Sequence, residues 1–385
     1  MNTAVKAFEG AAVLAALLFA GRSLRLASGA NDRIAALEPV EDLPLLSIVV
    51  PARDEARSIE RCVQSLLAQR YPRFEVIVVD DESSDATPEI LARLAEHDRR
   101  LRVTRGEPLP DGWVGKPWAL HQGASIARGE WLLFTDADTF HEPLAAASSV
   151  RYALERQLDA LSLLTTQELG TLAERALLPS ILWTIAFAIG PFDAMNDPRK
   201  IDVALFNGQF ILMRAAAHAA IGGHRAVAGE IAEDYELARL MKRDGRFRIM
   251  LAGANDLVRT RMYRSAREIW NGFTKNMYLG ARGNRIALVG GLAGLACVSP
   301  LPELLAVRAL ARGRRRQAAL MIAAIALTTG AAEIGMRRSG FRAGSGLWLP
   351  LGLATTVAIV LNSTRRYAGG RGVSWRGRLY RGGTR

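Results

Sequence analysis

Apolar residues in the first third of the chain form short, nearly continuous runs of strand length. These runs cover residues 45–50, 74–79, 101–104 and 131–135. Between them, apolar residues recur at helical spacing over residues 59–67, 88–96 and 118–127. Strands that alternate with helices pair in parallel, and the helices cover the sheet. The pattern therefore predicts an α/β domain built on a parallel sheet.

Acidic residues follow three of these predicted strands at the point where each strand ends. In an α/β sheet, ligands bind beyond the carboxyl ends of the strands. A solvated turn explains any single acidic cluster at least as well as a site does. Three clusters at one edge of one sheet favour a site. The clusters are Asp54-Glu55, Asp80-Asp81-Glu82 and Asp136-Ala137-Asp138.

The pair Asp136 and Asp138 indicates the chemistry of this site. Side chains two residues apart in an extended segment can share a side. Two convergent carboxylates repel each other unless a cation lies between them, and Mg²⁺ or Mn²⁺ prefers oxygen ligands and bridges phosphates. The pair therefore predicts a divalent metal site in an enzyme that uses a diphosphate-bearing donor.

Five motifs, taken in order along the chain, resemble family 2 glycosyltransferases. The resemblance covers roughly residues 45 to 280 and implies the GT-A fold, a doubly wound, mostly parallel α/β sheet. Two segments, 110–116 and 261–276, look most like the membrane-associated branch, which includes hopene-associated and carotenoid-acid glycosyltransferases. The motifs are Val-Pro-Ala-Arg-Asp-Glu (50–55), Val-Asp-Asp-Glu-Ser-Ser-Asp (79–85), Gly-Lys-Pro-Trp-Ala-Leu (115–120), Asp-Ala-Asp (136–138) and Glu-Asp (233–234).

The resemblance assigns roles to individual residues. Asp136 and Asp138 would hold the metal, and Asp234, beside Glu233, would be the general base of an inverting transfer. A helix that begins with acids can also carry them only for its dipole, so capping remains an alternative for the Glu233-Asp234 pair. The nucleotide-sugar would be bound by Ala52, Arg53, Glu55, Asp80, Asp81, Lys116 and Asp136.

Lys116 has a physical reason to bind phosphate. It lies in a glycine-bearing loop at the start of a predicted helix, where backbone N–H groups and an ammonium both favour phosphate oxygens. Without the flanking motif, a solvated surface lysine would be about as good an explanation.

The acceptor side departs from the family pattern. Many relatives carry Gln/Arg-X-X-Arg-Trp after the base, whereas this chain has Arg264-Ser265-Ala266-Arg267-Glu268. Its tryptophan, Trp270, comes three residues after Arg267, and it is equally explained as a membrane-interface or core aromatic. The acceptor-side candidates are Gly208, Arg264, Arg267, Trp270 and Lys275.

The positive charge is confined to the C-terminal part. The chain carries a formal charge of +12, but from Arg308 onward it has fifteen arginines, no lysine and one acid, Glu333. The part before Arg308 therefore has a charge of −2. Basic residues that flank apolar spans fit anionic lipid headgroups rather than nucleic acid. Two distant cysteines, Cys62 and Cys297, indicate neither a disulfide framework nor a thiolate zinc site.

Apolar segments at both ends predict membrane attachment. Residues 1–28 would form an uncleaved anchor, followed by the catalytic domain at 45–282, a membrane region at 286–362 and a basic cytoplasmic tail at 363–385. Within the membrane region we expect a broken hairpin over 286–305, returning at residues 299–302, and two crossings over 318–334 and 347–361. This arrangement would keep both larger arginine clusters in the cytoplasm. The apolar stretch 177–192 is expected to be an interfacial helix or, equally, a core helix.

Together with the apolar segments, the resemblance implies a membrane-bound hexosyltransferase with its catalytic domain in the cytoplasm. It would use Mg²⁺ or Mn²⁺ to transfer one sugar from a nucleotide-sugar, expected to be UDP-linked, to a membrane lipid such as a polyprenoid or hopanoid. A processive polysaccharide synthase is the alternative enzyme, and a non-catalytic membrane scaffold with the same fold is the alternative from another class.

Overall fold

The chain folds into two compact units, each with its own core. The computed structural model describes residues 3–28, 33–254, 256–280, 285–368, 372–375 and 378–380. The sheet unit comprises residues 30–168 and 192–262, and the helical unit comprises residues 1–29, 169–191 and 263–385. The predicted single domain at 45–282 is therefore divided, because the apolar segment 169–191 packs with other apolar helices.

The sheet unit is built on a seven-stranded, mostly parallel sheet in the order β3-β2-β1-β4-β8-β6-β9. β1 pairs in parallel with both β2 and β4, whereas β8 lies antiparallel between β4 and β6. A second, three-stranded sheet has the order β5-β10-β7. The strands are β1 (Leu46–Ala52), β2 (Phe74–Asp80), β3 (Leu101–Arg105), β4 (Trp131–Phe134), β5 (Thr139–His141), β6 (Ala160–Leu164), β7 (Thr166–Gln167), β8 (Ile211–Arg214), β9 (Ile249–Gly253) and β10 (Val258–Thr260).

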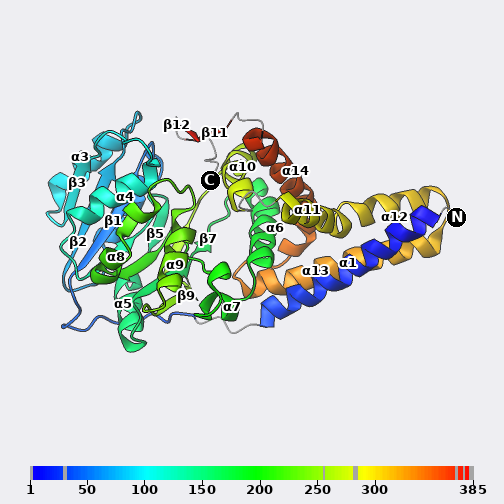
Figure 1. Ribbon diagram of the computed structural model, residues 1–385, viewed down its shortest axis with the longest axis horizontal. Coiled ribbons are helices and arrows are strands. Elements are labelled where there is room, and N and C mark those ends of the chain that lie inside the picture. Colours follow the sequence, from blue (N-terminus) through cyan, green and yellow to red (C-terminus); the bar gives the residue numbers. More distant parts are fainter. Residues whose placement is uncertain are drawn as a thin grey trace. The chain divides into compact units, whose positions relative to one another are not determined.

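Helices cover both faces of the large sheet, as a doubly wound fold requires (Figure 1). Alternate residues of β1 serve the two cores: Ile48 and Val50 pack with Val63 of α2, while Val49 packs on the opposite face with Leu237 of α9. The predicted α/β architecture is confirmed. The helices are α2 (Ile59–Leu67), α3 (Thr87–His97), α4 (Gly115–Ser125), α5 (Ala145–Glu155), α7 (Phe192–Asn196), α8 (Ala215–Ala220) and α9 (Glu233–Asp244).

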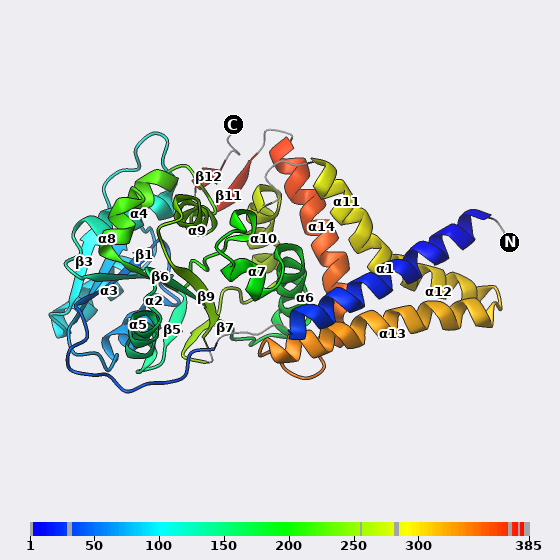
Figure 2. The same cartoon turned by 60° about the horizontal axis from the view of Figure 1, so that its bottom comes forward.

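The helical unit consists mainly of long apolar helices (Figure 2). Among the described residues, five segments are long and apolar enough to cross a membrane: Val5–Ser28, Leu172–Ile189, Val289–Ala311, Arg315–Arg338 and Ser345–Tyr367. Large apolar side chains such as Leu18, Val307 and Leu347 are 65%, 66% and 75% exposed, as expected of surfaces that lipid covers. The helices are α1 (Thr3–Ser28), α6 (Leu172–Ile189), α10 (Ala266–Gly280), α11 (Arg285–Val298), α12 (Leu301–Ala311), α13 (Arg315–Arg338) and α14 (Leu349–Ala368).

One predicted membrane segment, 286–305, differs from expectation. The chain breaks between α11 and α12 at Ser299-Pro300, as predicted, but in both views α12 continues onward from α11 and does not fold back (Figures 1 and 2). A proline at the start of α12 bends the chain without reversing it. The helix over the apolar stretch 177–192 is α6, which packs against α14 and belongs to the helical unit.

Candidate active site

Lys116 lies at the centre of the candidate site and joins three motifs that are distant in the sequence. α4 begins at Gly115, earlier than the predicted residue 118, so Lys116 belongs to the first helical turn. Its Nζ lies 2.7 Å from Asp136 Oδ1 and 2.9 Å from Glu233 Oε1. The parallel register brings the ends of neighbouring strands to one edge, and α4 and α9 both deliver their first turns to that edge.

The charged groups around Lys116 change one another's pKa values. Burial by itself lowers the pKa of the Lys116 ammonium, but Asp136, Glu233 and Asp234 together outweigh it and hold this pKa well above its ordinary value. Burial raises the pKa of Glu233; the Lys116 charge opposes the rise and Asp234 adds to it. The Glu233 side chain is 5% exposed and that of Lys116 is 32% exposed. Lys116 is thus a permanent cation that neutralises one buried acid, Glu233, and two half-buried acids, Asp136 and Asp234.

The turn at residues 207–209 orients Asp234. The backbone N–H of Gly208 donates to Asp234 Oδ2 at 2.9 Å, and that of Tyr235 donates to Oδ1 at 2.8 Å. A Cβ at position 208 would lie 2.7 Å from Lys116 Nζ and 3.0 Å from Asp234 Oδ2. Glycine therefore lets this turn approach both charged groups without displacing the Lys116 ammonium.

Asp136 and Asp138 follow β4 on a tight turn. Ala137 between them is buried, whereas both acidic residues are half-buried. The carbonyl of Asp138 accepts from the backbone N–H of Arg261 at 3.4 Å and from Thr260 Oγ1 at 3.3 Å, which fixes the turn to the end of β10. The backbone of this turn is therefore held in place by hydrogen bonds, and the two acidic side chains are partly exposed to solvent at the edge of the sheet.

The residues at this rim fit a hard divalent cation. Within the described ranges, no group of three or more His, Cys, Asp or Glu side chains converges as a complete metal site. The protein would contribute the oxygens of Asp136 and Asp138, and the other positions would be left for water and phosphate oxygens. A small number of carboxylates completed by substrate phosphates is the usual arrangement for Mg²⁺. The donor set is thus suited to a metal that binds together with a diphosphate.

The predicted nucleotide-binding residues lie on two loops that are bonded to each other. The backbone N–H of Asp81 donates to the carbonyl of Ala52 at 2.8 Å, and Arg53 Nη1 donates to the carbonyl of Asp81 at 2.5 Å. Asp80 and Asp81 are 7% and 4% exposed. Glu55 lies on the first of these loops, and its carboxylate accepts a hydrogen bond from Ser58. The structure therefore brings all five residues to the ends of β1 and β2, beside the end of β4.

A buried polar network beneath the Asp136 turn was missed by the sequence reasoning. His141 Nε2 lies 3.1 Å from Thr135 Oγ1 and 3.0 Å from Thr139 Oγ1. Thr139 Oγ1 donates to the carbonyl of Asp136 at 2.8 Å, and Thr135 Oγ1 donates to that of Gln209 at 2.7 Å. Burial lowers the pKa of His141 to about 3, so the imidazole is neutral. The network joins the Asp136 turn to the turn that holds Asp234. In the sequence, this network is visible only as polar residues that follow the apolar run of β4.

Of the acceptor-side candidates, Gly208 lies at the site itself. Arg264, Arg267, Trp270 and Lys275 belong to the helical unit, just before or within α10. Arg264 and Arg267 are exposed, and Trp270 is half-buried. Their contribution to acceptor binding remains a prediction.

The chain is similar to known glycosyltransferases in sequence and in fold. Residues 47–222 match the family described as Glycosyl transferase family 2. The chain is similar to 4,4'-diaponeurosporenoate glycosyltransferase of Staphylococcus haemolyticus, with 24% identity over 61% of this chain and 62% of the relative. It is also similar to beta-monoglucosyldiacylglycerol synthase of Trichormus variabilis, with 40% identity over 25% of this chain and 20% of the relative. The matches thus span less than two thirds of these relatives.

One solved structure is similar over nearly the whole chain. It is a mannosyltransferase from Pyrobaculum calidifontis in complex with GDP-Man and Mn²⁺, with a TM-score of 0.53 and 19% identity. The match covers 94% of this chain and 97% of that one. At this identity the likeness establishes the fold. Residues 47–222 therefore form a glycosyl transferase family 2 domain, and the chain adopts the GT-A fold.

Proposed function

We propose that this glycosyltransferase transfers a single sugar from a UDP-sugar to the polar head of a membrane lipid, with inversion at the anomeric carbon. The observation that carries the proposal is the convergence of Lys116, Asp136, Glu233 and Asp234 at the carboxyl edge of the sheet. A carboxylate pair suited to a divalent cation, with an ammonium beside it, offers the positive charge that stabilises a diphosphate leaving group.

A lipid acceptor is supported by the relatives and by composition. One relative is named for a carotenoid acid and another for a glucosyldiacylglycerol. The helical unit supplies apolar helices long enough to hold the enzyme at a bilayer. An acceptor whose tail stays in the membrane needs to present only a hydroxyl or carboxyl to the site. We further propose that this site faces the cytoplasm, where nucleotide-sugars are made.

In this proposal each residue has a defined task. Asp80, Asp81 and the Ala52–Glu55 loop bind the nucleoside, since buried carboxylates accept hydrogen bonds from base N–H and ribose hydroxyl groups. Lys116 pairs with phosphate oxygens, and Glu233 holds the ammonium in place. Asp136 and Asp138 would hold a divalent cation, which would supply Lewis-acid stabilisation of the departing nucleoside diphosphate.

Asp234 acts as the general base. Its two oxygens accept backbone hydrogen bonds from Gly208 and Tyr235, so the carboxylate is held in one orientation while it removes the acceptor proton. The acceptor oxygen then attacks the anomeric carbon from the face opposite to the diphosphate, and the configuration inverts. If the acceptor is a carboxylate, Asp234 positions it without taking a proton.

The test uses full-length protein in detergent, a panel of nucleotide-sugars with Mn²⁺, and lipid extract as the acceptor. We expect a UDP-sugar to raise the thermal midpoint and to yield a glycolipid with one sugar of inverted configuration. Asp234→Asn should retain donor binding and lose transfer by roughly 10²–10⁴-fold. Glu236→Gln, on the same helical turn but paired with Arg239, is the matched control. Full turnover by Asp234→Asn would exclude Asp234 as the base, and a polymeric product would favour the processive alternative.

A further inference from the structure

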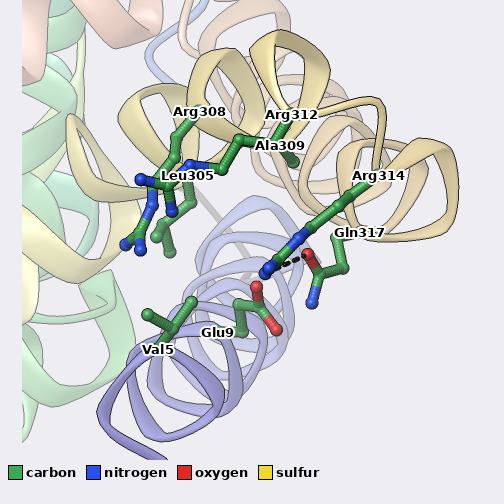
Figure 3. A pocket seen from close by; sticks show the side chains of 8 residues that line it. All are labelled: Val5, Glu9, Leu305, Arg308, Ala309, Arg312, Arg314 and Gln317. Carbon is green, nitrogen blue, oxygen red and sulfur yellow. Dashed lines mark hydrogen bonds between the residues drawn. The ribbon is translucent and has the colours of Figure 1, made fainter. Parts of the chain in front are cut away.

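Helices α1 and α13 run side by side and in parallel (Figures 1 and 2). At one end, Arg338 Nη1 donates to the carbonyl of Ala27 at 2.8 Å. At the other end, Val5 and Glu9 of α1 meet Arg314 and Gln317 (Figure 3). The first residues of both helices therefore lie together, and so do the last. If both helices cross a bilayer, they cross it in the same direction.

We call the membrane side on which α1 ends, at Ser28, the near side. The polypeptide leaves α1 there and continues into the sheet unit. α10 directly follows the sheet unit and has 15 residues, or about 22 Å of helix, which is too short to cross a hydrocarbon core of about 30 Å. α11 therefore also starts on the near side. The segment Val289–Ala311 then carries the chain across, and α13 brings it back to the near side at Arg338.

α14 begins and ends on the near side. Its start is tied to the last turns of α13, where Glu333 accepts from the backbone N–H groups of Gly344 and Gly346 at 2.9 and 2.7 Å. Near its end, Ser363 Oγ donates to the carbonyl of Thr274 in α10 at 2.6 Å. α14 therefore does not cross in this arrangement. The membrane region would cross through α11–α12 and α13, in place of the expected segments 318–334 and 347–361, and α1 would cross as the expected anchor.

This arrangement separates the two arginine clusters. Of the later arginines, those that the structure describes, at positions 337, 338, 342, 365, 366 and 378, belong to the near side, in keeping with the tendency of basic residues to stay in the cytoplasm. The turn between α12 and α13 lies on the far side and carries five more arginines, at positions 308, 312, 314, 315 and 316. Since that tendency opposes arginines on the far side, their presence there calls for a ligand that offsets their charge.

The far turn and α1 together line a shallow, open notch. Figure 3 shows the Arg308 and Arg312 side chains reaching from α12 across this notch and Arg314 reaching toward Gln317 near Glu9. The three arginine residues are exposed, and Glu9 is the only acid among the residues that line the notch. The lining, which we call the arginine notch, comprises Val5, Glu9, Leu305, Arg308, Ala309, Arg312, Arg314 and Gln317.

The walls next to the notch indicate that its ligand is a lipid. On α12, Leu304, Val307 and Leu310 are 63%, 66% and 58% exposed, on the same helix as Arg308 and Arg312. Apolar side chains that end at a row of arginines mark the level where acyl chains meet headgroups. A guanidinium pairs with phosphate oxygens through two parallel hydrogen bonds.

We propose that the arginine notch binds the phosphate of an anionic phospholipid in the leaflet opposite to the near side. The proposal depends on α1, α11–α12 and α13 crossing the membrane and is independent of which sugar the enzyme transfers. A lipid held there would fasten α1 to the α12–α13 turn, because both elements line the notch.

The first experiment tests the sidedness. Ala311→Cys and Ser339→Cys, both at exposed positions, are treated with a membrane-impermeant maleimide on intact cells, with the parent protein as background for Cys62 and Cys297. We expect the two positions to be labelled from opposite sides: Ala311→Cys in intact cells, and Ser339→Cys only after permeabilisation. Labelling of both positions from one side would overturn the proposal. Because labelling does not require enzyme activity, its result tests the sidedness independently of the proposed function.

The second experiment tests the ligand. Full-length protein in detergent is titrated with phosphatidylglycerol, phosphatidylcholine or inorganic phosphate, and the thermal midpoint and the lipid retained in native mass spectra are measured. Phosphatidylglycerol should bind, and the triple variant Arg308→Gln, Arg312→Gln, Arg314→Gln should weaken its binding by roughly 100-fold. The matched control replaces Arg337, Arg338 and Arg342, at the other end of α13, and should bind as the parent does. Equal losses in both variants, or an equal effect of inorganic phosphate, would overturn the lipid site.

Discussion

An alanine at position 208 is expected to disable the site without unfolding the protein. Its Cβ would lie 2.7 Å from Lys116 Nζ, whereas ordinary contacts begin near 3.5 Å, so the ammonium must retreat by roughly 0.8 Å. That movement lengthens the bonds to Asp136 and Glu233, now 2.7 and 2.9 Å. The backbone φ angle of Gly208 is not positive, so an alanine there adds no backbone strain to this effect.

The magnitude follows from this displacement. A misplacement of about 1 Å at a reacting centre costs on the order of 100-fold in rate. We therefore expect kcat/KM of Gly208→Ala to fall by roughly 10- to 100-fold, or about 1.4–2.7 kcal/mol of transition-state stabilisation. The free energy of unfolding should change by less than about 1 kcal/mol, because the end of a lysine side chain moves easily and alanine restricts the unfolded chain.

The assay is sugar transfer to lipid, with thermal unfolding as the check on folding. Gly229→Ala is the matched control, because its Cβ would meet only the carbonyl oxygen of Gly112, at 3.4 Å. A double-mutant cycle with Lys116→Ala then tests the cause. If the displaced ammonium is responsible, Gly208→Ala adds little in the Lys116→Ala background. Equal losses in both backgrounds would refute the reasoning.

Three further predictions concern the metal, the charge balance and pH. Asp138→Asn should weaken Mn²⁺ binding in the presence of donor by at least about tenfold in calorimetric titration, since one of two carboxylate ligands loses its charge; unchanged affinity would contradict the metal assignment. Lys116→Met should lower the free energy of unfolding at pH 7, measured by chemical denaturation, by about 1–3 kcal/mol, because Glu233 stays buried without its partner. The loss is smaller than for a fully buried ion pair because the lysine side chain is partly exposed and water screens its charge. The pKa of His141 falls from 6.5 to about 3 on folding, so the unfolded chain binds more protons between these values and stability decreases as pH falls below 6.5. At pH 5 this amounts to about 2 kcal/mol, and His141→Gln should remove that part of the pH dependence; identical profiles for parent and variant would count against it.

Local patterns in the sequence were enough to predict much of the site. The strands that became β1, β2 and β4 were visible as apolar runs, and each ends next to the acids that were expected to follow it. Asp136 and Asp138 could be named because acids that follow the strands of a parallel sheet come to the same edge, whereas Asp234 was named from the resemblance to the family. The GT-A fold followed from the order of five motifs and agrees with the comparisons.

Contacts between distant residues could not be predicted in this way. The sequence placed Lys116 near phosphate, but only the packed sheet unit shows its ammonium between Asp136 and Glu233. The need for glycine at position 208 likewise depends on side chains that arrive from α4 and α9. Charge and hydropathy located the apolar segments along the chain. That α13 runs parallel to α1, and that α14 ends beside α10, is known only from the contacts between these helices. Hydrophobic periodicity reports which face of an element is buried, whereas the partner that buries it is chosen by shape and charge across the whole fold.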